Sequence, residues 1–129
     1  MESPHKSKSG LVRIWRAFFY SLEGFAAALK HEHAFRQELL LCVVLMPFAI
    51  FMSLEPVERV LLIGSLLLVL VVELLNSAIE AVVDRVSLDN NDLSKRAKDL
   101  GSAAVFLSFV IGIVTWWLIL GQALVKLIR

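Results

Sequence analysis

Five polar residues recur on one side of the most apolar stretch of the chain, which runs from Val60 to Val83. They are Glu73, Asn76, Ser77, Glu80 and Asp84. An α-helix has about 3.6 residues per turn, so offsets of 3, 4, 7 and 11 from Glu73 place all five on one stripe. An acidic side chain at the centre of a membrane-spanning helix costs about 2.5–3.5 kcal/mol on insertion scales. Packing alone does not justify that cost twice on one face, so the stripe indicates a functional site.

The residue types of this stripe suit phosphoryl transfer to a lipid. Carboxylates and an amide are oxygen ligands of the kind that Mg²⁺ prefers, usually one or two carboxylates together with substrate phosphates. Phosphoryl transfer needs that metal ion, cations on the phosphates and a positioned nucleophile. Glu73, about two helical turns deeper than Glu80, would accept the proton of a lipid hydroxyl as a general base. Lys98, Arg13 and Arg36 would supply the cations.

Two other interpretations remain open on the residues alone. A buried polar seam that sets the register of a helix would account for Asn76, but it explains two acids less well. A small proton-coupled channel or transporter would also place acids within a span. The sequence contains no GxxxxGK[ST] phosphate-binding motif and no kinase glycine loop, so a nucleotide site would be unorthodox.

The composition indicates an integral membrane protein. Of the 129 residues, 58% are hydrophobic, and the mean hydropathy is +0.76. Soluble domains are usually only about 45–50% apolar even with glycine included. The net charge of +1 says little about partners, and no nucleic-acid partner is expected. Cys42 is the only cysteine, which excludes an intrachain disulfide.

Four helical segments are expected to position the stripe. Residues 10–30 carry apolar and aromatic side chains every three or four positions opposite polar ones, which is typical of an amphipathic helix in the membrane interface. Transmembrane helices are predicted over 35–54, 60–83 and 100–125, with a charged loop over 84–99. We therefore expect one all-α membrane domain over residues 1–129.

The distribution of Lys and Arg predicts the orientation of these helices. Basic residues gather on the N-terminal side and in the 84–99 segment, whereas the first turn carries only Arg59. The N-terminus and the 84–99 segment are therefore expected to face the cytoplasm, with Glu80 and Asp84 at the cytoplasmic end of their helix. That orientation gathers Glu32, Lys98 and Asp99 near the stripe, which a transporter would not explain.

Small residues predict close helix packing in the third span. Ala104, Ser108 and Gly112 repeat at every fourth position, which lets helix backbones approach closely in lipid. Because three helices by themselves cannot enclose a polar site from lipid, we expect a homo-oligomer whose subunits share sites.

Three strings resemble the small trimeric bacterial diacylglycerol kinases of the inner membrane. They are AFRQE, which ends at Glu38, VELLNSAIEAVVDR (Val72–Arg85) and AKDLGSAAV (Ala97–Val105). The similarity extends without evident gaps over most of the chain, between Arg13 and Trp117. It implies an enzyme of phospholipid metabolism that phosphorylates diacylglycerol with ATP to give phosphatidic acid. It also implies a homotrimer in the bacterial inner membrane, with a surface helix and three transmembrane helices per subunit and active sites at the subunit interfaces.

The resemblance further implies roles for individual residues. Glu73 would be the catalytic base, and Glu32 and Glu80 would be the carboxylates that hold Mg²⁺. The nucleotide-binding candidates are Arg13, Tyr20, Glu32, Glu80, Asp89, Asn90, Asn91, Lys98 and Asp99. The candidates for binding the lipid substrate are Arg13, Ser21, Ala34, Phe35, Arg36, Gln37, Glu38, Arg59, Glu73, Ser102 and Trp116. Asn76 and Asp84 would support the site.

The chain departs from the family pattern at Asp89-Asn90-Asn91, where relatives often have Glu-Tyr-His close to the adenine and ribose. A sister branch of the family phosphorylates undecaprenol with the same stripe. Ser77 and the KDLGSAAV string look more like the diacylglycerol branch, so undecaprenol kinase is the alternative and a small proton-coupled transporter is less favoured.

Overall fold

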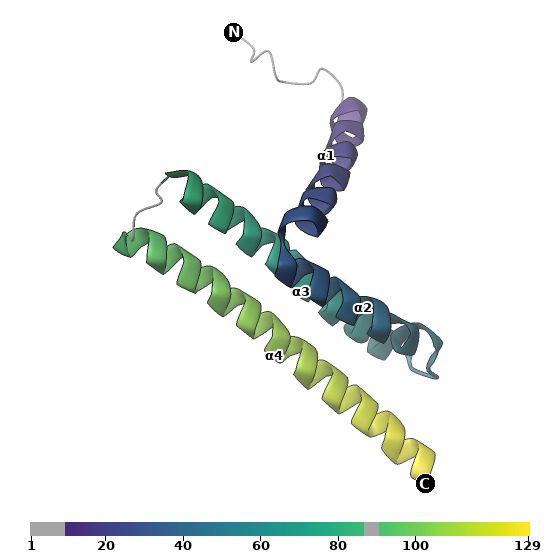
Figure 1. Cartoon of the computed structure of the whole chain (residues 1–129). Helices are drawn as coiled ribbons and strands as arrows, with labels where there is room; N and C mark the ends of the chain where they lie inside the picture. The colour runs from purple at the N-terminus through teal and green to yellow at the C-terminus, as the bar shows by residue number, and fades with distance from the viewer. Residues whose placement is uncertain (1–9, 87–90) are drawn as a thin grey trace. The chain divides into compact units, whose positions relative to one another are not determined.

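The regular structure is helical throughout the described part of the chain. The computed structural model describes residues 10–86 and 91–129. In chain order, the helices are α1 (Gly10–His31), α2 (His33–Phe51), α3 (Pro56–Val86) and α4 (Asp92–Ile128) (Figure 1). The last three are long and apolar enough to cross a membrane. The predicted all-α fold is thereby confirmed, and three of its helices have the length and composition expected of transmembrane helices.

The chain divides into two compact units, one ending at Glu32 and the other formed by residues 33–129. In the first unit, α1 exposes large apolar side chains along its length, as an interfacial helix requires. The Phe19 ring packs edge-to-face on Trp15 and on Phe18, with ring centroids 5.2 and 5.9 Å apart. These rings form an aromatic face of the kind that inserts at the headgroup level.

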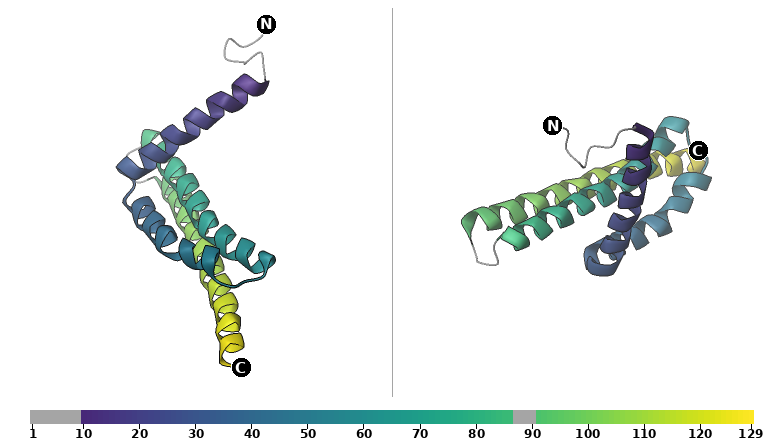
Figure 2. Two further views of the ribbon diagram at one scale, coloured as in Figure 1. Left: turned by 90° about the vertical axis from the view of Figure 1, so that its right-hand side faces the viewer. Right: turned by 90° about the horizontal axis from the view of Figure 1, so that it is seen from above.

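In the second unit, α3 packs against both α2 and α4. Figures 1 and 2 show α3 and α4 running antiparallel and side by side. The buried core of this unit consists of Cys42, Ala49, Leu62, Leu66, Trp116 and Ile119. Most other large apolar side chains of α2–α4 are exposed, including Leu67 and Phe106. Such surfaces suit contact with lipid or with other subunits.

The turn between α2 and α3 is organised by Arg59. Its guanidinium donates hydrogen bonds to the carbonyl oxygens of Ala49, Ile50, Met52 and Leu54. The last carbonyls of a helix have no partner within the helix, so a guanidinium with five donors can satisfy several of them at once. Pro56 begins α3, at the position where proline's missing N–H costs nothing. Arg59 therefore fixes how the chain reverses direction between two spanning helices.

The helix ends differ from the predicted segments at both connections. The first spanning helix, predicted over 35–54, ends at Phe51, where the Arg59 hydrogen bonds close the turn. The loop predicted over 84–99 is shorter, because α3 continues to Val86 and α4 already begins at Asp92. Asn91 has extended backbone and its side chain accepts a hydrogen bond from the Leu93 N–H at 2.8 Å. This N-cap starts a helix whose charged first turns precede the apolar span.

The small-residue ridge of the third span is only partly packed within the subunit. Ser108 is buried and donates to the Val105 carbonyl at 2.6 Å. Ala104 is exposed, and a methyl group at Gly112 would meet nothing within 4 Å. Two of its three positions are therefore accessible for contact with another helix.

Arg59→Gln should destabilise the α2–α3 turn. The shorter amide cannot reach all four carbonyls, and the loss should lower the free energy of unfolding by about 1–2 kcal/mol. Unfolding in detergent followed by circular dichroism measures it, with Lys126→Gln as the control at an exposed position in the last turn of α4. If both variants unfold like the wild type, the turn does not depend on Arg59.

Candidate active site

The polar stripe of α3 becomes steadily more exposed along the helix. Glu73 and Asn76 are 5% and 8% exposed, Ser77 and Glu80 are half-buried, and Asp84 is exposed. Because α3 is a regular helix with a rise of about 1.5 Å per residue, Glu73 lies about 10 Å deeper along its axis than Glu80. The stripe therefore runs from a buried acid to the C-terminal end of α3, which precedes the connection to α4.

Glu38 of α2 lies opposite Glu73, and the two carboxyl groups are at hydrogen-bonding range. Glu38 is buried, and its Oε2 has no hydrogen-bond partner in the described structure. An ionised carboxylate only accepts hydrogen bonds, so a bond between two carboxyl groups requires a proton on one of them. The pair can thus hold and exchange a proton inside an apolar unit. The sequence predicts Glu38 as a substrate contact in the neighbourhood of Glu73, but it does not predict that the two carboxyl groups pair.

Asn76 connects the buried and the exposed parts of the stripe. Its side-chain amide donates to Glu80 Oε1 at 3.5 Å, a long contact one helical turn along α3. Its Oδ1 is buried, has no hydrogen-bond partner within the described residues and faces Gly101 of α4. In the sequence, Gly101 contributes only to the AKDLGSAAV string that carries the family resemblance. A glycine inside a helical segment often has a packing reason, so it was a signal for close contact with another helix.

Two ion pairs lie where α3 and α4 adjoin. Lys98 Nζ is 2.7 Å from Asp84 Oδ1, which joins the first turns of α4 to the last turns of α3. Asp99 pairs with Lys95 at 2.6 Å, one turn apart on α4. Lys95 was not among the sequence-predicted residues, although its offset of four from Asp99 is the usual spacing for such a pair. Exposed pairs of this kind add little stability. Their main effect is to place charged groups near the exposed end of the stripe.

The other predicted residues of the second unit lie at different positions along the lengths of its helices. Ala34, Phe35, Arg36 and Gln37 are in the first turns of α2, and Ser102 follows Gly101 on α4. Trp116 is buried and donates from Nε1 to Ser65 Oγ at 3.1 Å. Arg59 lies about 21 Å from Glu73 along α3, at the opposite turn. The structure therefore gathers Glu38 and Lys98 with the stripe but keeps Arg59 away from it.

The remaining predicted residues belong to the first unit or to the region between α3 and α4. Arg13, Tyr20, Ser21 and Glu32 belong to the first unit, where Ser21 Oγ donates to the Ala17 carbonyl at 2.8 Å. Asp89 and Asn90 lie outside the described residues. Asn91 uses its side-chain oxygen as the N-cap of α4.

The donor atoms at the exposed end of the stripe fit a metal ion that is shared with a phosphate ligand. Among residues 10–86 and 91–129, no three His, Cys, Asp or Glu side chains gather as a preformed metal site. Glu80 and Asp84 nevertheless offer carboxylate oxygens one turn apart on α3. Mg²⁺ characteristically binds one or two carboxylates, keeps waters and takes its other ligands from phosphates.

An apolar cavity of about 220 Å³ lies between α2, α3 and α4, on the side of the acid pair that is nearer to the α2–α3 turn. Cys42, one turn beyond Glu38, and Val69, one turn before Glu73, both line it, as does Trp116. The acids therefore have polar neighbours on one side and an apolar cavity on the other. That arrangement suits a ligand with a polar head and a hydrocarbon chain.

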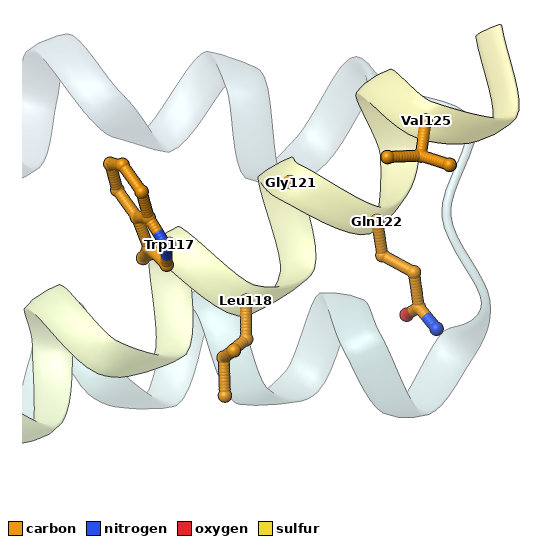
Figure 3. A pocket seen from close by; sticks show the side chains of 5 residues that line it. All are labelled: Trp117, Leu118, Gly121, Gln122 and Val125. Atoms are coloured by element: carbon orange, nitrogen blue, oxygen red, sulfur yellow. The ribbon is translucent and has the colours of Figure 1, made fainter. Parts of the chain in front are cut away.

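A shallower hollow of about 520 Å³ lies towards the C-terminal end of α4. It is lined by Trp117, Leu118, Gly121, Gln122 and Val125, and Figure 3 shows Leu118 and Gln122 pointing to the same side of the helix. All five residues belong to one helix and none is acidic or basic. The hollow therefore has no titratable side chain in its lining, and its apolar residues suit contact with lipid or with another subunit.

Comparison with known proteins gives consistent results. A family model described as prokaryotic diacylglycerol kinase matches residues 19–120. A diacylglycerol kinase of Pseudomonas aeruginosa is 56% identical over 118 residues, which cover 92% of this chain and 96% of the relative. The diacylglycerol kinase of Escherichia coli K12 is 46% identical over 112 residues, covering 87% and 92%. That of Helicobacter pylori 26695 is 40% identical over 126 residues, covering 98% and 94%.

Because Glu38 and Glu73 are both buried, replacing the two together tests whether the pair has a structural or a functional role. The double variant Glu38→Met, Glu73→Leu should be at least as stable as the wild type, and up to about 4 kcal/mol more stable, because buried polar pairs are often replaced favourably by apolar side chains. Unfolding of the purified variant in detergent measures this. A clear loss of stability would show that the pair serves mainly to hold α2 against α3.

Proposed function

The chain belongs to the prokaryotic diacylglycerol kinase family, and on this basis we propose that it transfers the γ-phosphoryl group of ATP to the hydroxyl of diacylglycerol. The product is phosphatidic acid. It is a lipid kinase with a lipid substrate in a membrane setting, as the family match and the named relatives indicate. The observation that carries the proposal is the buried Glu73, at the deep end of a stripe whose other end bears Glu80 and Lys98.

Glu73 acts as the general base in this proposal. It is the deepest acid of the stripe, and its partner Glu38 gives the abstracted proton a second oxygen site to occupy. The lipid oxygen attacks the γ-phosphorus while the bond to the bridging oxygen of ADP breaks, and the hydroxyl proton passes to Glu73. The depth of about 10 Å relative to Glu80 suits a hydroxyl at the level of the acyl chains and a phosphate at the surface.

Glu80 and, as the family resemblance implies, Glu32 would hold Mg²⁺ together with the ATP phosphates. A kinase family is consistent with a need for a metal ion, and when bound the ion neutralises phosphate charge. Glu80 is half-buried and is oriented by the amide of Asn76. Lys98 brings three donors to the same end of the unit, where Asp84 holds its amino group at 2.7 Å.

The remaining nucleotide contacts come from both sides of the α3–α4 connection and from α1. They are proposed to be Arg13, Tyr20, Asp89, Asn90, Asn91 and Asp99. The Asn91 side chain also caps α4, so a nucleotide would contact it next to a helix N-terminus.

The lipid substrate lies with its hydroxyl beside the Glu38–Glu73 pair and part of a chain in the adjoining apolar cavity. The cavity supports this placement because its lining begins one turn from each acid. Residues 34–37 at the start of α2, together with Arg13, Ser21 and Ser102, contact the polar part of the lipid. Trp116 borders the cavity, whereas Arg59 meets the far end of a chain beyond its role in the turn.

The chain forms one membrane domain that assembles as a homotrimer in the bacterial inner membrane. The N-terminus and the α3–α4 connection face the cytoplasm, in keeping with the basic residues on that side. The trimer is supported by the exposed apolar surfaces of α2–α4, which would cover the half-buried stripe from lipid. Ala104 is exposed and leaves room for a neighbouring helix, whereas Gly112 borders the apolar cavity within the subunit.

The proposed activity is tested with purified protein in mixed micelles. Mg²⁺-dependent transfer of labelled phosphate from ATP is measured with diacylglycerol, with undecaprenol and without lipid. We expect phosphatidic acid as the preferred product. Faster phosphorylation of undecaprenol would assign the chain to the sister activity, and ATP consumption without a lipid product would contradict the proposal.

Glu80→Gln should remove most of the activity while the oligomer still assembles, because the amide keeps the shape and loses the charge. Loss of a metal carboxylate should also raise the Mg²⁺ concentration needed for half-maximal rate. Initial rates over a Mg²⁺ titration measure both effects. Wild-type activity of this variant at low Mg²⁺ would exclude Glu80 from the metal site.

Glu73→Gln should lower kcat by at least about 10²-fold while the affinity for ATP stays within a few-fold, since the nucleotide does not need this residue. Glu73→Asp should be nearly as damaging, because one methylene less withdraws the carboxylate from the hydroxyl. Steady-state kinetics in mixed micelles give both parameters. A large rise in KM for ATP at unchanged kcat would move Glu73 to the nucleotide site.

A further inference from the structure

Gly101 is buried in α4 directly against Asn76 of α3. A Cβ atom at Gly101 would lie 2.1 Å from Asn76 Oδ1 and 3.2 Å from its Cγ, and contacts below 3.0 Å essentially never occur. None of the described glycines has a positive φ, so the backbone conformation does not require glycine here. Glycine inside a helix costs about 1 kcal/mol relative to alanine. The reason to accept that cost at Gly101 is space for the Asn76 amide.

The other described glycines show no such contact. Ideal Cβ atoms at Gly64 and Gly112, as well as at Gly10, Gly24 and Gly121, would meet nothing within 4 Å. Gly101 is therefore distinguished from the other described glycines by what it touches. The atom it touches belongs to the candidate active site.

The amide of Asn76 is held by this contact. Its Oδ1 has no conventional hydrogen-bond partner among the described residues and faces the Gly101 Cα, whose C–H is a weak donor. Its nitrogen is thereby directed at Glu80 Oε1, 3.5 Å away. A methyl group at Gly101 would push the amide aside and carry the nitrogen away from Glu80.

The cost of such a change falls on the site more than on the fold. Oδ1 is the far end of a side chain, so Asn76 can turn away while the helices keep their places. Glu80 would then lose the donor that orients it. Small displacements of catalytic groups can reduce rates by about 10²-fold.

We infer that Gly101 is a positioning residue for catalysis: by lacking a side chain, it lets α4 press the Asn76 amide towards Glu80. The inference rests on the proposed roles of Asn76 and Glu80. It assigns to a residue without functional groups a specific effect on metal-dependent turnover.

The first test compares Gly101→Ala with Gly64→Ala in the purified protein. Gly101→Ala should lower kcat at least about tenfold and raise the Mg²⁺ concentration for half-maximal rate several-fold, as misplacement of a ligand predicts. Its helix content and thermal stability should stay close to those of the wild type, and Gly64→Ala should have wild-type kinetics. Wild-type kinetics of Gly101→Ala would overturn the inference. A rate loss with an unchanged Mg²⁺ requirement would also overturn it, provided that Glu80→Gln does raise that requirement.

A double-mutant cycle with Asn76→Ala identifies the residue through which Gly101 acts. Without the amide there is nothing to displace, so adding Gly101→Ala to Asn76→Ala should change kcat by less than about twofold. A further loss as large as in the wild-type background would show that Gly101 acts through another contact.

Mn²⁺ binding in the presence of ATP, followed by electron paramagnetic resonance, repeats the cycle without turnover. The same non-additivity is expected in the Mn²⁺ affinity, and additive effects in both measurements would refute the role of Gly101. Glu80→Gln separates the two proposals. If it leaves the Mn²⁺ affinity unchanged, the proposed metal site is wrong, and non-additivity in kcat alone then decides the role of Gly101.

Discussion

Two carboxyl groups buried in an apolar helical unit must remain hydrogen-bonded, and much of the second unit serves that requirement. Glu73 of α3 meets Glu38 of α2, so the register between these helices has to be held within a fraction of a turn. Arg59 helps to set that register from the opposite end by binding carbonyls in the last turn of α2 and just beyond it.

The contact between α3 and α4 determines the rest of the site. Gly101 lets the two helices approach at Asn76, and Lys98 joins them again at Asp84 nearer the connection. Between these contacts the stripe changes from buried to exposed over a few turns. A proton acceptor and a charged, phosphate-compatible surface therefore occur on the same helix, at separate depths.

A kinase for a membrane lipid has to bring together a substrate in the bilayer and a nucleotide in water. The half-buried stripe meets that need because neither substrate must leave its own phase. The apolar cavity beside the acids and the exposed apolar faces of α2–α4 are consistent with a lipid environment around the deep end of the stripe. This arrangement is also what membership of the diacylglycerol kinase family leads one to expect, because such an enzyme acts on a lipid.

The sequence by itself determined the helices, the three spans and the stripe from Glu73 to Asp84, because hydrophobic length and helical period are local properties of the chain. It also indicated the family through strings that lie on α2, α3 and α4. Only the tertiary structure paired Glu38 with Glu73, set Gly101 against Asn76 and directed Arg59 at the α2 carbonyls. These contacts join residues on different helices or turns, and the rotation and register of packed helices decide them. The sequence pattern of one helix does not contain that information.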